Sequence, residues 1–168
     1  PNWLECLVTT PPPPPAAIAI AVSIDRAWTS IGACSNGTNP HLGSVKRERG
    51  TAWVVAEAKR IQDEHHIPVV VDGKGPAESL IEKLEAAGVN VTIASTEDYL
   101  GACADLIDRV DALDVEHGGY DDLDEAVAVA AKRMVGERVA WARKLGDVSM
   151  LEAVTLALWG AGSGVSVY

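Results

Sequence analysis

The N-terminal part of the chain has an order of apolar and polar positions that predicts strands before helices. Two short apolar runs, Ile18–Ser23 and Trp28–Cys34, surround the polar turn Ile24–Ala27 and predict a β-hairpin. A third short strand is expected over Leu42–Arg47. The segment Thr51–His65 then has apolar residues at the spacing of a helix. The pattern therefore predicts three antiparallel strands followed by a helix.

The central part of the chain alternates strands and helices. The continuous β-branched run Ile67–Val71 is typical of a strand buried on both faces. A helix over Pro76–Ala87, ended by the next glycine, leads to a strand over Val89–Ala94. The following helix is expected over about Thr96–Leu113, with Thr96 as its cap. Strands and helices in this alternation are βαβ units, which place successive strands in parallel.

The C-terminal part predicts a helix over Leu123–Lys132, a hairpin over Met134–Trp141 and a last apolar helix over Ser149–Trp159. Three antiparallel strands, then βαβαβ, then a hairpin and a helix, are the order of a ribonuclease H-like mixed α/β sheet flanked by helices. This order differs from that of doubly wound nucleotide-binding folds, and neither G-x-G-x-x-G nor G-x-x-x-x-G-K-[ST] is present. We expect this domain to cover residues 16–160.

The two ends of the chain are expected to lie outside the domain. Residues 1–15 contain Pro11–Pro15, which favour stiff polyproline II, and are interpreted as a linker to an upstream module. Residues 161–168 are interpreted as a flexible tail. The three scattered cysteines, the absence of metal-type Cys/His spacing and the lack of a long apolar run indicate a soluble, intracellular protein without a membrane partner.

Several carboxylates follow predicted strands or precede the last helix. Asp72 ends the buried strand, Asp25 follows the first strand, and Asp147 stands before the last helix, where Glu152 lies one turn further on and can supplement it. If the two strands are parallel neighbours, these oxygens can converge on a hard cation such as Mg²⁺ or Mn²⁺, and a pair of such ions cleaves phosphodiesters. Asp25 and Asp72 can also serve as turn residues, and Asp147 as a helix N-cap. Both interpretations stay open for each residue.

Four segments in order, Asp25–Ile31, Gly50–Val55, Val71–Ala77 and Asp147–Trp159, resemble the nuclease half of the tailed-bacteriophage terminase large subunit. The resemblance implies an endonuclease that cuts concatemeric viral double-stranded DNA during packaging, with Asp25, Asp72 and Asp147 as catalytic residues holding Mg²⁺ or Mn²⁺, two ions in all. It also implies an upstream packaging ATPase domain in the same polypeptide, a portal and a small terminase subunit as partners, and the host cytoplasm and procapsid as location.

One position departs from the family's pattern. Many members carry an aspartate inside the first strand, where this chain has Ala21. Either Asp25 substitutes for it, or the first ligand is missing. This departure motivates one alternative to an endonuclease, a non-catalytic module that guides or docks DNA. A separate alternative, within the same fold, is a junction resolvase-like nuclease.

The charge distribution limits how the domain can hold DNA. The formal net charge of −10 argues against tight, non-specific nucleic-acid binding by the whole surface. Basic residues nevertheless gather around the predicted C-terminal hairpin and after Asp72. We expect DNA contacts from Arg138, Arg143, Lys144 and Lys74, with the cluster Lys46–Arg49 as the next candidate.

Overall fold

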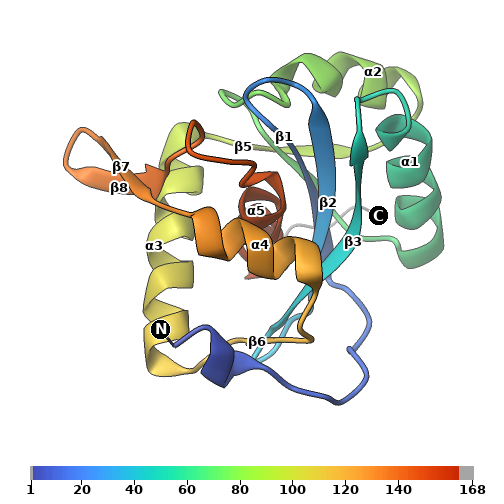
Figure 1. Ribbon diagram of the computed structural model, residues 1–168. Coiled ribbons are helices and arrows are strands. Elements are labelled where there is room, and N and C mark those ends of the chain that lie inside the picture. Colours follow the sequence, from blue (N-terminus) through green and yellow to red (C-terminus); the bar gives the residue numbers. More distant parts are fainter. Residues whose placement is uncertain (1, 163–168) are drawn as a thin grey trace.

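The computed structural model describes residues 2–162, and a six-stranded mixed sheet forms its centre (Figure 1). The strand order is β5-β4-β1-β2-β3-β6. β1, β2 and β3 are antiparallel, whereas β4 runs parallel to β1, and β5 parallel to β4. The predicted ribonuclease H-like arrangement is confirmed. The strands are β1 Ala17–Val22, β2 Trp28–Cys34, β3 His41–Arg49, β4 Val69–Asp72, β5 Val91–Ala94 and β6 Glu116–His117.

Helices cover both faces of the sheet (Figure 1). One face carries α1 (Val54–His65) and α2 (Ile81–Ala86), which the 3₁₀ turn Glu78–Leu80 precedes. The other face carries α5 (Ser149–Gly162), with α3 and α4 beside it. A separate hairpin projects next to α3. Its strands are β7 Lys132–Val135 and β8 Arg138–Trp141, while α3 spans Thr96–Ala112 and α4 Asp121–Val129.

The side-chain alternation of β1 explains why α5 lies so close to the sheet. Ile18 and Ile20 point into the core beneath α1 and α2, whereas the small Ala19 and Ala21 belong to the core beneath α5. At Gly32 in β2, a Cβ atom would lie 2.7 Å from the backbone nitrogen of Val154. Small residues on this face therefore let the backbone of α5 rest directly on the two central strands.

Four local features differ from the sequence-based predictions. The helix predicted over Pro76–Ala87 is instead the 3₁₀ turn Glu78–Leu80 followed by α2 over Ile81–Ala86. The cap of α3 is Ser95 rather than Thr96, since the Ser95 hydroxyl accepts from the Asp98 backbone N–H and the Asp98 carboxylate accepts from that of Ser95. The helix predicted over Leu123–Lys132 begins earlier and ends at Val129, because the residues from Lys132 onward pair with β8. The two-residue strand β6 was not predicted, since so short a segment has no periodicity.

Part of the segment expected to be a linker packs on the domain. Leu4–Cys6 form a 3₁₀ turn, and both Trp3 and Cys6 are buried. The backbone at Leu7 forms a parallel bridge with His117 in β6. Pro11–Pro14 are exposed and form no helix or strand. Of the expected tail, residues 161 and 162 complete α5, and the remainder lies outside the described residues. No helix within residues 2–162 is long and apolar enough to cross a membrane.

Candidate active site

Strand pairing brings Ala21 and Asp72 side by side. β1 and β4 run parallel with Ile20 opposite Val71, so the next residue on each strand is Ala21 and Asp72. Because residues alternate between the faces of a strand, Asp72 points to the same side as Val70, toward α5. Asp72 is buried, with 7% of its surface exposed. An acidic residue at the end of a β-branched strand is therefore held inside the fold, next to Ala21.

Arg143, in the loop between β8 and α5, lies between Asp72 and Glu152. Its Nη2 atom is 2.8 Å from Glu152 Oε2 and 3.5 Å from Asp72 Oδ2. Its Nε also donates to Glu152 Oε2, at 2.9 Å. The space that Ala21, Asp72, Arg143 and Glu152 share measures only about 10 Å³. One guanidinium thus fills the place where the two carboxylates converge.

Glu152, on α5, is a deeply buried charged residue. It is 3% exposed and accepts a second hydrogen bond from the Tyr99 hydroxyl, at 2.7 Å. Burial raises the pKa of the Glu152 carboxyl, and the charge and hydrogen bonds of Arg143 act against that rise. Burial together with the neighbouring Glu152 also raises the pKa of Tyr99, so this phenol remains a hydrogen-bond donor. The three side chains form a buried network around one carboxylate.

Asp25 and Asp147 are each held by local hydrogen bonds. Asp25 is exposed, and its Oδ1 accepts from the Ser23 hydroxyl at 2.6 Å and from the Ala27 backbone N–H at 3.0 Å. These bonds lower the pKa of the Asp25 carboxyl and close the turn between β1 and β2. Asp147 Oδ1 accepts from the Ser149 backbone N–H, as a helix cap does.

The second oxygen of Asp147 accepts from Arg47 Nε in β3, at 2.7 Å. Asp72 also has a turn contact, since its Oδ1 accepts from the Lys74 backbone N–H at 3.0 Å. Every predicted metal ligand therefore also serves as a local cap or turn residue. Both functions that the sequence left open for Asp72 remain compatible with this geometry, whereas both oxygens of Asp147 are engaged by Arg47 and by the Ser149 backbone N–H.

An open groove of about 380 Å³ connects these side chains, and we call it the β1/α5 groove. One wall comes from the turn between β1 and β2, and the other from the loop before α5. Asp25, Asp147 and Glu152 all line the groove, while Asp72 adjoins it behind Arg143 and Glu152. The lining residues are Ser23, Ile24, Asp25, Trp28, Arg143, Lys144, Gly146, Asp147, Val148, Ser149 and Glu152.

The three predicted ligands do not form one cluster. Within residues 2–162, no group of three or more Asp, Glu, His or Cys side chains is arranged to hold a metal ion. The carboxylates that do converge are Asp72 and Glu152, with Arg143 between them. Mg²⁺ and Mn²⁺ are commonly held by one or two carboxylates and several waters, so this pair fits such an ion once the guanidinium moves aside.

Glu152 was expected only to supplement Asp147, and the structure places it at the centre instead. Its signal in the sequence is that it is the one charged residue of the otherwise apolar segment Ser149–Gly162. A charged side chain on a helix that is buried nearly all round is costly unless it is paired. Glu152 can therefore be identified from the sequence as a residue that needs a partner, whereas no pattern in the sequence identifies Arg143 as that partner.

The residues predicted to contact DNA have different surroundings. Lys74 and Lys144 are exposed. Arg138 in β8 forms an ion pair with Glu97 at 2.8 Å, so its charge is partly compensated. Arg143 is occupied by the two buried carboxylates. Two of the four predicted cations are therefore already engaged by acidic groups of the chain.

Solved structures of large terminase nucleases share this fold. The nuclease of thermophilic phage G20c is 17% identical, with 92% of this chain and 94% of that chain covered and a TM-score of 0.71. The HK97 bacteriophage large terminase is 12% identical, with a TM-score of 0.74. The alignment covers 94% of this chain and 42% of that chain. No protein-family model and no curated protein matches the sequence.

A third structure, the nuclease domain of the large terminase subunit gp2 of bacterial virus Sf6 with manganese, is 12% identical. The alignment with this structure covers 94% of this chain and 96% of that chain, with a TM-score of 0.61. The phage G20c nuclease has also been solved with bound magnesium. The chain thus has the ribonuclease H-like fold of terminase nuclease domains over nearly its whole length.

Proposed function

We propose that this chain is the nuclease domain of a phage large terminase subunit and cuts concatemeric viral double-stranded DNA with Mg²⁺ or Mn²⁺ during genome packaging. The observation that carries the proposal is the convergence of Asp72 and Glu152 at one end of the central strands. The fold supports it, because its structural neighbours are terminase nuclease domains, some of them solved with magnesium or manganese.

In this proposal Asp72 and Glu152 hold the ion, which when bound activates water and stabilises the negative charge that develops on the phosphate. Tyr99 keeps the Glu152 carboxylate oriented through its hydrogen bond. Arg143 leaves the carboxylates and turns into the groove, where its guanidinium can contact a phosphate oxygen. A second ion would require Asp25 or Asp147 to give up the hydrogen bonds that now fix them.

The proposed partners follow from the proposed function. Double-stranded DNA is the substrate, and an upstream packaging ATPase domain, a portal and a small terminase subunit complete the packaging assembly. The assembly would act in the host cytoplasm, transiently at the procapsid. An ATPase domain on the same polypeptide would raise the local DNA concentration for a domain whose net charge is −10.

A plasmid-cleavage assay tests the proposal. Wild-type protein should nick or linearise supercoiled DNA in Mn²⁺ or Mg²⁺, and EDTA should stop the reaction. Asp72→Asn should reduce cleavage to background because it removes a negative ligand while keeping the side-chain shape. The matched control is Asp63→Asn on α1, where the aspartate pairs with Lys59 away from the groove. Full cleavage by Asp72→Asn would refute the proposed role of Asp72.

A non-catalytic module that guides DNA is the second candidate, and Ala21 together with Arg143 favours it. An alanine where a ligand is expected, next to a built-in guanidinium, suits a site that no longer binds an ion. Wild-type protein that binds DNA but never cuts it would support this candidate. Cleavage gained by Ala21→Asp would then identify the missing ligand as the reason. Preferential cutting of four-way junctions over linear duplex in the same assay would instead indicate a junction resolvase-like nuclease.

A further inference from the structure

Trp28 at the start of β2 supports two arginine side chains of the neighbouring strand. Arg49 is its partner across the β2–β3 ladder, and the Cζ atom of Arg49 lies 4.6 Å from the centre of the Trp28 ring. The Cζ atom of Arg47 lies 3.8 Å from the same ring. Stacking on an aromatic face orients a guanidinium and leaves its N–H groups available at the edge. We call Trp28, Arg47 and Arg49 the Arg–Trp ledge.

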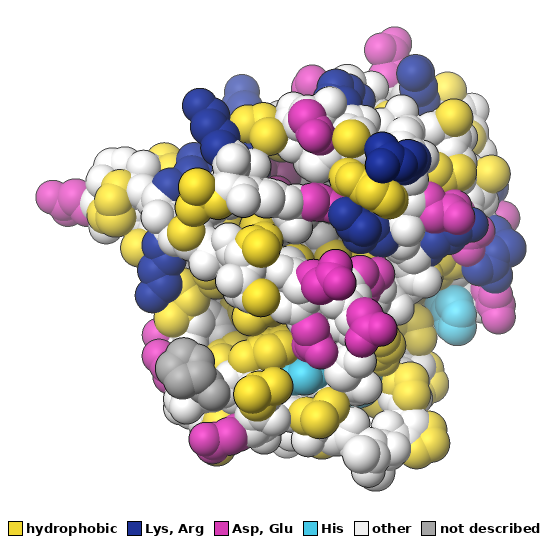
Figure 2. Space-filling model, in the orientation of Figure 1, with side chains coloured by type: hydrophobic (Ala, Val, Ile, Leu, Met, Phe, Trp, Pro, Cys, Tyr) yellow, Lys and Arg dark blue, Asp and Glu magenta, His cyan; other side chains and the backbone are white. Residues whose placement is uncertain are grey.

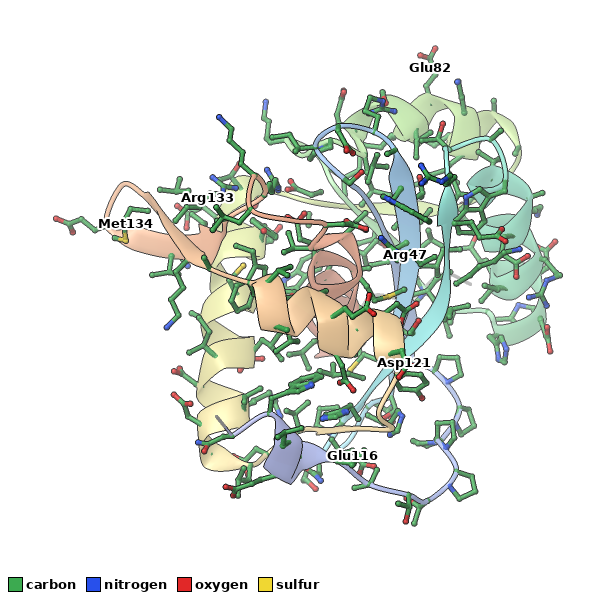
Figure 3. The ribbon with its side chains drawn as sticks, viewed as in Figure 1. Arg47, Glu82, Glu116, Asp121, Arg133 and Met134 are labelled. Atoms are coloured by element: carbon green, nitrogen blue, oxygen red, sulfur yellow. The ribbon has the colours of Figure 1, made fainter. Side chains whose placement is uncertain are left out.

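The ledge is anchored to the candidate active site. Arg47 uses its Nε to bind Asp147, in the loop that leads into α5. Figure 3 labels Arg47 on β3, from which its side chain reaches toward that loop. Residues two apart on a strand share a face, so Arg47 and Arg49 project on the same side of the sheet. Trp28 itself lines the β1/α5 groove, which leads to Glu152.

The positive charge of the ledge is only partly compensated, since Arg47 is paired with Asp147 and the charge of Arg49 helps to lower the pKa of the Asp25 carboxyl. The exposed Arg49 side chain makes no hydrogen bond or salt bridge within residues 2–162, and the Arg47 side chain has Asp147 as its ion-pair partner there. Lys144, also exposed, lines the groove on the opposite wall. Figure 2 shows basic side chains in this upper part of the molecule, while acidic ones gather over α4. Cations therefore flank the groove on both sides.

We propose that the Arg–Trp ledge, with Lys144 across the groove, binds phosphates of duplex DNA and positions the strand over the β1/α5 groove. The proposal rests on the proposed function for the location of the bond to be cut. Oriented guanidiniums suit the two oxygens of a phosphodiester. Within the ledge, Arg49 supplies a cation without an ion pair among residues 2–162, whereas Arg138 in the C-terminal hairpin is paired with Glu97. DNA enters across β2 and β3.

Binding of a fluorescent 30-base-pair duplex, followed by anisotropy in EDTA, tests the ledge without requiring an ion or cleavage. Arg49→Gln should weaken binding several-fold and should reduce the steepness of its salt dependence by about 0.9 in log K against log salt, the slope that one phosphate contact contributes. Arg60→Gln is the matched control, since Arg60 is exposed on α1 and pairs with Glu57 and Glu64. It changes the net charge equally and should leave both quantities unchanged.

A second variant separates charge from orientation. Trp28→Leu keeps both arginines and removes the ring on which they stack, so it should also weaken binding, with a thermal unfolding curve confirming that the protein is folded. Equal affinities of the Arg49 and Arg60 variants would overturn the ledge. Undetectable duplex binding by wild-type protein at low salt would also overturn the ledge. Displacement of the DNA by poly-glutamate of equal total charge would overturn it too, because it would indicate an acidic protein partner. Failure of wild-type protein to cut DNA would count against the nuclease and leave these binding results intact.

Discussion

The Arg143 guanidinium lies between two carboxylates that are far apart in the sequence. Asp72 ends β4 and Glu152 lies in the first turn of α5, and each is buried. A buried carboxylate without a partner is strongly destabilising, so the pair requires either a metal ion or a cationic side chain. Here Arg143 supplies that charge from within the chain. In the proposed function, metal binding at this site would therefore be a competition between an ion and Arg143.

The competition can be measured with Arg143→Leu. The variant leaves both carboxylates unpaired, and in EDTA we expect it to lose about 3–5 kcal/mol of stability, as is typical when one partner of a buried ion pair is removed. Mn²⁺ should then raise the melting temperature of the variant far more than that of wild-type protein, because ligand binding to the folded state stabilises it. Thermal unfolding with and without Mn²⁺ checks this. Arg143→Lys, which keeps a cation, is the control, and equal Mn²⁺ effects on Arg143→Leu and wild type would contradict the competition.

Some of these residues were predictable from the sequence and others were not, for a physical reason. Asp72 was identifiable because a continuous β-branched strand that stops at a carboxylate is unusual for a buried segment. Arg143 was placed in a DNA-contacting surface, since a loop arginine near other bases looks solvated. Whether its side chain turns outward or inward depends on the space beside Ala21, which arises only from the pairing of β1 with β4. Such long-range pairing has no local pattern in the sequence.

At the scale of elements, the alternation of large and small residues fixes the layers. The sequence of β1 is Ala-Ile-Ala-Ile-Ala-Val. Its side chains are therefore large on the face toward α1 and small on the face toward α5. This pattern made the central strands predictable from the sequence. β6 was missed because its two residues are held by pairing with β3 and by the N-terminal segment, not by their own composition. Elements with a repeating pattern were predicted, and those defined by their neighbours were not.

The close approach of α5 to β2 predicts the effect of Gly32→Ala. A methyl group there would lie 2.7 Å from Val154 N and 2.9 Å from Ala153 C, both backbone atoms that cannot rotate away. We expect a loss of about 1–3 kcal/mol, as for overpacked cores, measured by urea unfolding. Gly101→Ala in α3 is the matched control, because its Cβ would meet only the Arg138 side chain, at 3.6 Å. That variant should be neutral or gain up to about 1 kcal/mol from helix propensity. Equal stabilities of the two variants would contradict the contact.

At the scale of the whole molecule, the domain extends further toward the N-terminus than its sequence pattern indicated. The boundary expected at residue 16 followed from the prolines, which cannot enter a sheet interior. The segment before them nevertheless lies against the domain beside α3 and α4 (Figure 1), with Trp3 and Cys6 in the core. A single tryptophan does not produce a periodic pattern, so this packing was not visible in the sequence. The exposed prolines then lead from the packed segment into β1.

The packed N-terminal segment should contribute to the stability of the entire domain, and Trp3→Ala measures that contribution. Trp3 stacks on the buried His117 with ring centres 3.9 Å apart, and its Nε1 donates to Asp124 at 2.8 Å. Removing a buried tryptophan typically costs about 3 kcal/mol or more. For a domain of this size that corresponds to a melting temperature lower by about 6–12 °C. Leu4→Ala is the control, because Leu4 is 75% exposed and should change the melting temperature little. If both variants melted at the wild-type temperature, residues 2–8 would be an appendage and not part of the cooperative unit.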